Sequence, residues 1–176
     1  MTPRKSLRTS LALTSVLLAS LGTALAYDFN EQFLVAACPT EQPSNGKIKS
    51  MSVVTPNGVG VRHRGTLTGD AVLYCQIDVS DPSYNYFNWL QIVAEDDTTT
   101  GSITATLYRQ DILNPSAPVA MASVTTGNVA GVQIASTSLD DSLNEYQYVY
   151  WIEVRLSRSS TASTVTAYSV ALMDVF

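Results

Sequence analysis

The sequence between Tyr146 and Leu156 reads YQYVYWIEVRL, and its apolar side chains recur at every second position over eleven residues. The even positions are Tyr, Tyr, Tyr, Ile, Val and Leu, whereas the odd positions include Gln147, Glu153 and Arg155. A period of two is typical of a β-strand with one buried face. The pattern predicts a strand over Tyr146–Leu156 with its even face toward the core.

Similar segments surround this one and are separated by turn sequences. Ser102–Gln110 alternates cleanly, and Val165–Phe176 puts Tyr168, Val170 and Leu172 on one face. No segment has a sustained apolar period of 3.6 residues, so helical crossovers are not expected and the strands should pair antiparallel. The prediction is an all-β, antiparallel two-sheet sandwich, jelly-roll-like, with eight or nine strands. The other predicted strands are Lys47–Thr55, Val59–Arg64, Ala71–Val79, Phe87–Ala94, Val119–Thr125 and Val132–Ser138.

The first 26 residues have the three parts of a secretory signal peptide. A basic start (Arg4, Lys5, Arg8) precedes the apolar run Leu11–Leu21, and Ala24-Leu25-Ala26 forms a small-x-small cleavage site. We expect cleavage after Ala26, a secreted or periplasmic product, and no membrane span. Residues 27–46 are expected to form an extended N-terminal segment, and residues 47–176 a single β-sandwich domain.

Composition excludes several classes of protein. The chain has 176 residues, 45% of them hydrophobic and 14% charged, which is not the composition of a disordered protein. Three of the ten basic residues and none of the 15 acidic ones lie in the signal, so seven against 15 remain and the mature net charge is −8. Phosphate contacts need clustered Lys and Arg, so nucleic acid is not an expected partner.

The two cysteines, Cys38 and Cys75, are expected to form one disulfide, because an even pair in an exported chain is typically bonded. The alternative is two buried thiols. The pair lacks the C-x-x-C spacing of redox and metal sites, so a bridge would have a structural role.

Signals for catalysis and for metal binding are weak. His63 is the only histidine, and its position between Arg62 and Arg64 favours an exposed strand over a catalytic base. The carboxylates show no paired pattern of the kind that glycosidases use. We therefore predict no catalytic residues and no cofactor. Two acidic turns offer oxygen ligands that Ca²⁺ prefers, and they are weak candidates only if the turns converge. Their residues are Asp96, Asp97, Asp140 and Asp141.

An aromatic cluster, Tyr84-Asn85-Tyr86-Phe87-Asn88-Trp89, follows a proline turn. Exposed aromatic faces stack on sugar rings, and Asn side chains bond to hydroxyl groups. Tyr84, Tyr86 and Trp89 are therefore candidate ligand-binding residues. Trp151, on the otherwise polar face of its strand, is a candidate second platform or interface anchor. The competing interpretation places Phe87 and Trp89 in the core, with the tyrosines capping the sandwich.

The stretch GSITATLYR at Gly101–Arg109, followed by MASV at Met121–Val124, NEYQYVYWIEV at Asn144–Val154 and YSV at Tyr168–Val170, carries a resemblance to known proteins. It resembles a loose group of uncharacterised exported bacterial β-sandwich modules, similar to phage-fibre and capsid jelly rolls. The resemblance covers roughly Trp89 to the C-terminus. It implies a sandwich fold and brings no catalytic motif.

Three functions remain open on the sequence. The first is a secreted, non-catalytic binding or structural module that binds carbohydrate or a protein partner, or that self-associates as a homo-oligomer. The second is a small eight-stranded outer-membrane β-barrel, which the length and the terminal Phe176 suit. The third is an exported hydrolase with an unrecognised acidic site, for which Glu153, Asp96 and Asp97 are the nameable carboxylates.

Overall fold

The computed structural model describes residues 28–38, 52–55, 59–63, 67–77, 87–97, 100–127 and 129–174. Within these ranges the chain forms ten strands and one short 3-10 turn, η1 (Val35–Ala37), and no helix there is long and apolar enough to cross a membrane. The strands are β1 (Asp28–Leu34), β2 (Ser52–Val54), β3 (Val61–His63), β4 (Gly69–Ile77), β5 (Trp89–Asp96), β6 (Gly101–Asp111), β7 (Val119–Thr125), β8 (Gly131–Ser138), β9 (Tyr148–Arg158) and β10 (Val165–Asp174).

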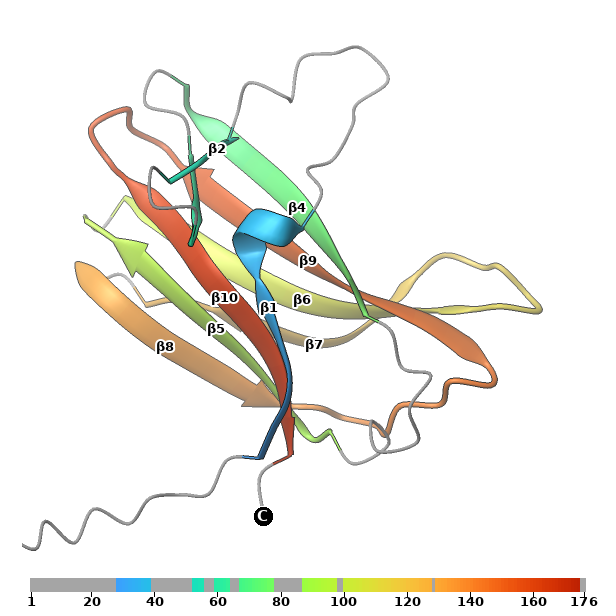
Figure 1. Cartoon of the computed structure of the whole chain (residues 1–176). Coiled ribbons are helices and arrows are strands. Elements are labelled where there is room, and N and C mark those ends of the chain that lie inside the picture. Colours follow the sequence, from blue (N-terminus) through green and yellow to red (C-terminus); the bar gives the residue numbers. More distant parts are fainter. Residues whose placement is uncertain are drawn as a thin grey trace, which may run out of the picture.

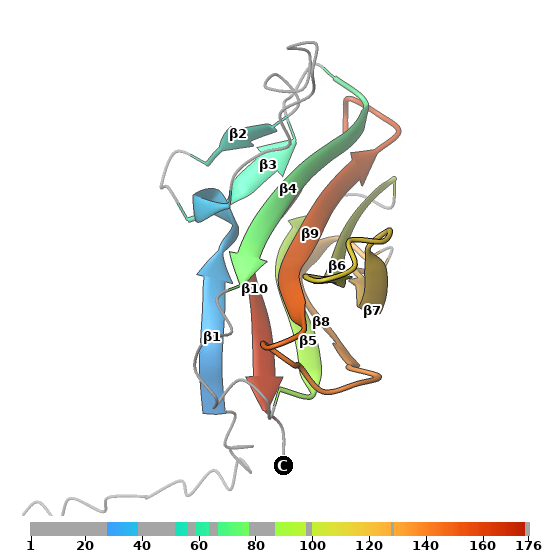
Figure 2. The same cartoon turned by 90° about the vertical axis from the view of Figure 1, so that its right-hand side faces the viewer.

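The strands form two antiparallel sheets that pack face to face (Figure 1). Sheet A has the order β2-β3-β10-β5-β8, with β1 also paired to β10, and sheet B has the order β4-β9-β6-β7. From β3 onward the chain changes sheet at each connection except the β6–β7 hairpin. This connectivity is that of a jelly roll, so the predicted fold class is confirmed. Figure 2 shows β1 and β7 at opposite margins of the sandwich.

The strand that the sequence did not predict is β1, which lies in the segment expected to be an extended lead-in. It pairs antiparallel with β10 from Asp28↔Asp174 to Leu34↔Ser169. No apolar alternation marks this stretch in the sequence. Its pairing therefore depends on the edge of β10 that the rest of the fold leaves available.

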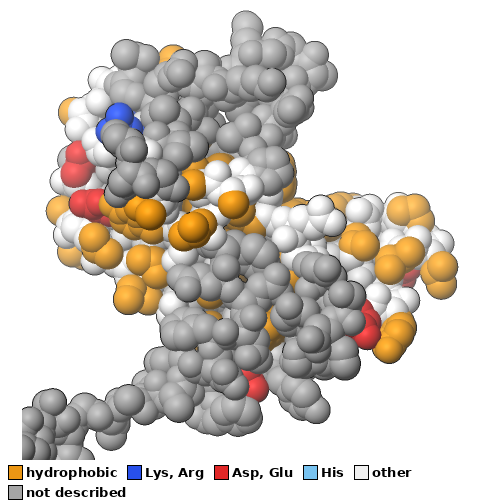
Figure 3. Space-filling model, in the orientation of Figure 1, with side chains coloured by type: hydrophobic (Ala, Val, Ile, Leu, Met, Phe, Trp, Pro, Cys, Tyr) orange, Lys and Arg blue, Asp and Glu red, His pale blue; other side chains and the backbone are white. Residues whose placement is uncertain are grey.

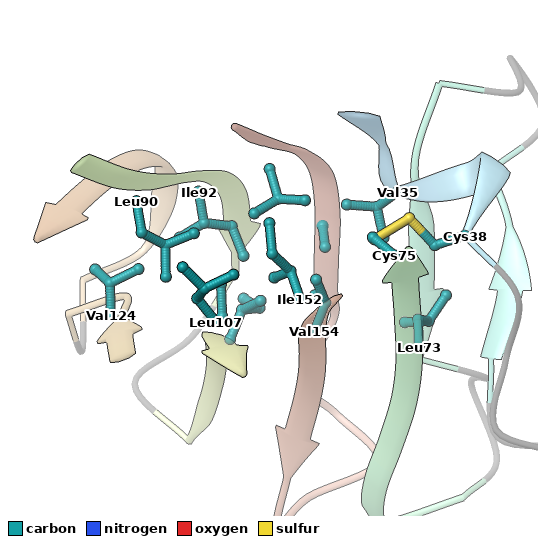
Figure 4. Packing of buried hydrophobic residues seen from close by; sticks show 14 of the residues in the cluster. Val35, Cys38, Leu73, Cys75, Leu90, Ile92, Leu107, Val124, Ile152 and Val154 are labelled. Atoms are coloured by element: carbon teal, nitrogen blue, oxygen red, sulfur yellow. A yellow bond between two sulfur atoms is a disulfide. The ribbon is translucent and has the colours of Figure 1, made fainter. Parts of the chain in front are cut away.

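The core lies between the two sheets and follows the alternation of the strands (Figure 4). In β9 the even positions Tyr150, Ile152, Val154 and Leu156 are buried, as predicted. The prediction that Tyr146 belongs to this buried face is wrong, because Tyr146 lies in a turn before β9 and is 85% exposed. Packed side chains from both sheets fill the space, among them Leu73, Leu90, Ile92, Leu107 and Leu172.

The even face of β10 is interrupted by a bulge. The register with β5 shifts between Ala167 and Ser169, so Val170 and Leu172 are fully buried while Tyr168 is only half-buried. The predicted grouping of Tyr168 with the core face is therefore wrong. Its hydroxyl instead donates a hydrogen bond to the carboxylate of Glu95. An extra residue in one strand reverses the side on which the preceding side chains lie.

The predicted disulfide is confirmed. Cys38, directly after η1, is bonded to Cys75 of β4, and Figure 4 shows the bridge beside Val35. Because β1 leads into η1 and pairs in sheet A, the bridge ties that sheet's N-terminal strand to sheet B.

Two basic groups that could be expected at the surface are buried. His63 is 1% exposed and its Nε2 lies 3.0 Å from the carbonyl oxygen of Gly69, so the expectation of an exposed Arg-His-Arg strand is wrong for the histidine. Arg158 is 4% exposed at the end of β9. Its Nε donates to the carbonyl of Leu67 at 2.6 Å and its Nη1 to that of Ser163 at 2.7 Å. Backbone carbonyl oxygens thus accept hydrogen bonds from this buried guanidinium at the end of the core.

Candidate functional site

The outer face of sheet B, called here the sheet-B face, gathers aromatic and polar side chains. Its strands are in register, so side chains of the same parity form rows across β4, β9 and β6. Gln76, Trp151 and Tyr108 make one row. The second row is Tyr74, Glu153 and Thr106, and the third is Val72, Arg155 and Thr104. The last row holds Asp70, Ser157 and Ser102.

Tyr108 and Trp151 form the aromatic centre of this face. They are direct cross-strand partners, their ring centroids are 5.6 Å apart, and their planes differ by 18°. Both side chains are partly exposed to solvent. Such a stack contributes about 0.5–1.5 kcal/mol beyond area burial, which holds both rings in one orientation. Two nearly parallel rings on the two central strands of the sheet form a preorganised apolar surface.

Charged and hydroxyl groups lie further along the same strands. Arg155 Nη2 donates to Glu153 Oε1 at 2.7 Å, and its Nη1 donates to Asp70 Oδ2 at 3.0 Å. The hydroxyl of Ser157 donates to the other oxygen of Asp70 at 2.7 Å. This hydrogen bond and the nearby Arg155 guanidinium lower the pKa of Asp70 below its usual value. Asp70 is therefore held as a carboxylate. Glu153 and Arg155 form an ion pair on this face.

The sheet-B face ends in an open hollow of about 530 Å³. Asp70, Ser157 and Ser102 belong to both the face and the hollow, and Arg158 adds to the lining. Its lining side chains carry hydroxyl, carboxylate and guanidinium groups. The hollow therefore offers hydrogen-bond partners to a polar group.

At the other end of the face, beyond Trp151, the β6–β7 and β8–β9 connections project from the sandwich (Figure 1). A cluster at their base holds them: the Arg109 guanidinium lies 4.8 Å from the centroid of the Tyr148 ring and pairs with Asp141 at 2.7 Å. Tyr150 Oη accepts a hydrogen bond from the Asn144 backbone at 2.6 Å. These contacts fix the loops whose tips carry the most exposed apolar side chains of the described chain. Those are Leu113 (87%) and Tyr146 (85%). Hydrophobic side chains also gather at the right-hand end of the molecule in Figure 3.

The structure places two of the four candidate ligand-binding aromatics, Trp89 and Trp151, in different sheets. Trp151 lies in the sheet-B face. Trp89 is half-buried in β5, where its neighbour Leu90 faces the core, so Trp89 lies on the outer face of sheet A. The two tryptophans therefore lie on opposite sides of the sandwich and cannot contact one small ligand together. Tyr84 and Tyr86 lie outside the described residues. Phe87 is 2% exposed and belongs to the core.

The two acidic turns do not converge. Asp96 pairs with Gly131 at the start of β8, whereas Asp140 and Asp141 follow the end of that strand. The intervening eight-residue strand spans roughly 25 Å, so the two pairs cannot share one cation. Asp96 is fully buried, and Asp97 accepts a hydrogen bond from the Thr164 backbone at 2.6 Å. No group of three or more metal-ligating side chains is found among the described residues.

Sequence reasoning missed Tyr108, although the pattern contained a signal for it. Within Ser102–Gln110, Tyr108 has the parity of Ser102, Thr104 and Thr106, the polar face. Trp151 likewise stands on the polar face of its own strand. Two large aromatics on solvent-facing positions indicate a surface site, but only the pairing of β6 with β9 brings them into contact.

Comparisons with known proteins identify no family for this chain. No family model and no curated protein matches the sequence. Among solved structures, the chain is similar to the module CsCBM6-3 of Clostridium stercorarium, solved in complex with cellobiose. The TM-score is 0.47 at 10% identity, over 81% of this chain and 92% of that one. It is also similar to a family 11 carbohydrate-binding module of Clostridium thermocellum, in complex with a β-1,3-1,4-mixed-linked tetrasaccharide. There the TM-score is 0.42 at 10% identity, over 69% of this chain and 79% of that one.

Proposed function

We propose that the chain is an exported, non-catalytic module that binds carbohydrate on the sheet-B face. The observation that carries the proposal is the stacked, solvent-facing pair of Tyr108 and Trp151 amid polar side chains. A large aromatic on the outer face of a sheet gains little from packing, so a pair of them in contact favours a binding role over a structural one.

The chemistry of the face matches that of a sugar. A pyranose ring presents C–H groups on its faces and hydroxyl groups around its rim. Trp151 and Tyr108 offer π-surfaces to the C–H groups. Gln76, in the same row, and Glu153, in the next row, offer hydrogen-bond donors and acceptors to the hydroxyl groups. Few polar groups around an apolar centre are typical of sites for small polar ligands.

The face is rigid, which lowers the entropic cost of binding. β9 and β6 are the central strands of sheet B, and their pairing is unbroken from Gly101↔Arg158 to Asp111↔Tyr148. The ion pairs around Arg155 further hold the side chains along β9. A site on central strands is more precisely positioned than one on loops.

The electrostatics of the face argue against acid–base catalysis there. A glycosidase needs one carboxyl group with a raised pKa to act as general acid. The pKa of Asp70 is shifted in the opposite direction, and Arg155 binds both Asp70 and Glu153. These carboxylates are therefore suited to accepting hydrogen bonds from hydroxyl groups.

Export is supported by the Cys38–Cys75 disulfide, which is typical of oxidising compartments. The signal peptide, cleavage after Ala26 and the secreted or periplasmic location remain part of this proposal.

The test uses the mature chain on a glycan array, followed by titration with the best soluble oligosaccharide. The chain has two tryptophans, so Trp89→Phe leaves Trp151 as the single reporter, and its fluorescence should change on binding. Trp151→Ala and Tyr108→Ala should each weaken binding at least tenfold. Trp89→Ala, on the opposite face, is the matched control and should bind normally.

Loss of binding with Trp89→Ala but not with Trp151→Ala would move the site to the other sheet and contradict the proposal. Release of reducing sugar from the bound oligosaccharide would contradict the non-catalytic part of it. Absence of any glycan signal on the array would remove carbohydrate as the ligand class.

A further inference from the structure

The outer edge of β8 is unusual among the sheet edges of this protein. β8 is the last strand of sheet A, and no described strand pairs with its other side. Every second residue of an edge strand directs its backbone N–H and C=O groups away from the sheet. Eight residues of β8 therefore offer a template for a further strand.

This edge lacks the features that usually prevent strand addition, namely charge, proline, a bulge or short length. From Ile112 to Leu139 the chain contains no Asp, Glu, Lys, Arg or His, although 14% of all residues are charged. β8 contains no proline, and it pairs with β5 in an unbroken register from Trp89↔Ser138 to Asp96↔Gly131. The edge is thus regular in register, uncharged and eight residues long.

The other edges differ in these respects. In sheet B, the pairing of the edge strand β7 with β6 has a register shift between Leu107 and Tyr108. The other edge strand of that sheet, β4, contains Asp70. β1, which pairs with β10 beside this path of strands, has a register shift and contains Asp28 and Glu31. β2, at the far end of sheet A, is only three residues long. Of these five edges, only β8 is a long strand with neither a charge nor an irregular register.

The side chains of β8 add an exposed apolar surface beside the edge. Val132 and Ile134 are 64% and 69% exposed, and Val129, just before the strand, is 64% exposed. Val93 of β5 lies beside Ile134 on the same face. Hydrophobic side chains gather over this margin in Figure 3. β-Branched side chains of this kind favour strand pairing.

We propose that the occupant of this edge is a second copy of the chain, whose own β8 pairs antiparallel with it about a twofold axis. An antiparallel pair of identical strands is self-complementary, so one surface serves both copies. The net charge is −5 for the full sequence and −8 without its first 26 residues, and a margin without charges is where two copies approach with the least repulsion. Sheet A then continues across the dimer as one sheet.

The apolar side chains select the register. If Gln133 of each copy lies opposite Gln133 of the other, Val132 lies opposite Ile134 in both halves. Directly opposed residues of an antiparallel pair lie on the same face, so these four side chains form one cross-strand cluster. A register centred on Ile134 would instead place Val132 opposite a serine. The dimer leaves both sheet-B faces open and does not depend on what they bind.

The first test is sedimentation of the mature chain from about 1 µM to 1 mM, a range that covers a small strand-addition interface. The chain should convert from monomer to dimer, and Ile134→Lys should keep it monomeric with an unchanged Tm. Leu113→Lys is the matched control: it adds the same charge at an exposed apolar residue elsewhere and should leave the dimer intact. A monomer at all concentrations, or equal loss of dimer in both variants, overturns the proposal.

The second test addresses the register. Opposed Cα atoms in an antiparallel pair are about 4.5–5.5 Å apart, within reach of a disulfide. Gln133→Cys should therefore form a covalent dimer on mild oxidation, whereas Ser136→Cys should not, because its two copies would lie about 20 Å apart. A covalent dimer through residue 136 but not 133 would overturn the proposed register.

Discussion

Replacing both cysteines, Cys38→Ala with Cys75→Ala, is expected to cost about 4 kcal/mol of unfolding free energy. The two residues are 37 positions apart, and closing a loop of that length removes about 4 kcal/mol of chain entropy from the unfolded state. The double variant leaves no unpaired thiol to oxidise. Since domains of this size are stable by about 5–15 kcal/mol, the variant should still fold but with a much reduced margin.

The position of the bridge strengthens this expectation. Cys75 is 1% exposed within the core, and Cys38 is 9% exposed next to Val35. The segment that the bridge secures, β1 with η1, pairs only with β10 among the described strands. Loss of the bridge should therefore lower protection against amide exchange in β1 more than in β9, which has partners on both sides.

Equilibrium denaturation in urea measures the effect. The midpoint should fall, and the m-value should rise slightly, because an unfolded chain without a cross-link exposes more surface. The wild-type chain in reductant should show the same loss, which separates the bridge from the substitutions. A loss below about 1 kcal/mol in both cases would refute the loop-entropy reasoning for this protein.

Three further predictions concern single residues. Val154→Asp should destabilise the chain by several kcal/mol, since it puts an unpaired charge in the core, while the adjacent Arg155→Leu should cost about 1 kcal/mol or less; equal thermal stability of the two variants would contradict the face assignment of β9. Gly101→Ala should cost about 1–3 kcal/mol in urea denaturation, because a Cβ there would collide with Val165, whereas Gly127→Ala, with its nearest neighbour 3.4 Å away, should be tolerated. The folded pKa of Asp70 lies below its unfolded value of about 3.8, so its stabilising effect is complete above that pH and is lost as pH falls through the folded pKa. The stability difference between wild type and Asp70→Asn should therefore shrink below about pH 4, and a difference that grows there would contradict the assignment.

Much of the local structure follows from the sequence. The alternation in Tyr146–Leu156 predicts which side chains of β9 are buried, because a strand of period two with one apolar face is stable only when that face is covered. The absence of a helical period predicts antiparallel pairing, and the two cysteines of an exported chain predict their bridge. Each of these inferences depends on neighbouring residues or on composition alone.

The site depends on information that no single strand carries. Alternation places Trp151 and Tyr108 on the polar faces of their own strands, but it does not say that β9 and β6 are neighbours. It likewise does not say that Trp89 belongs to the other sheet, or that the two acidic turns lie at opposite ends of β8. The bulge beside Tyr168 is a further example, since it arises from the pairing of β10 with β5. The sequence by itself thus determined nine of the ten described strands and the buried face of β9, whereas the tertiary structure decided the pairing of β1 and which strands share a sheet and an edge. The physical reason is that burial of a face is a local requirement, while strand order is set by long-range pairing.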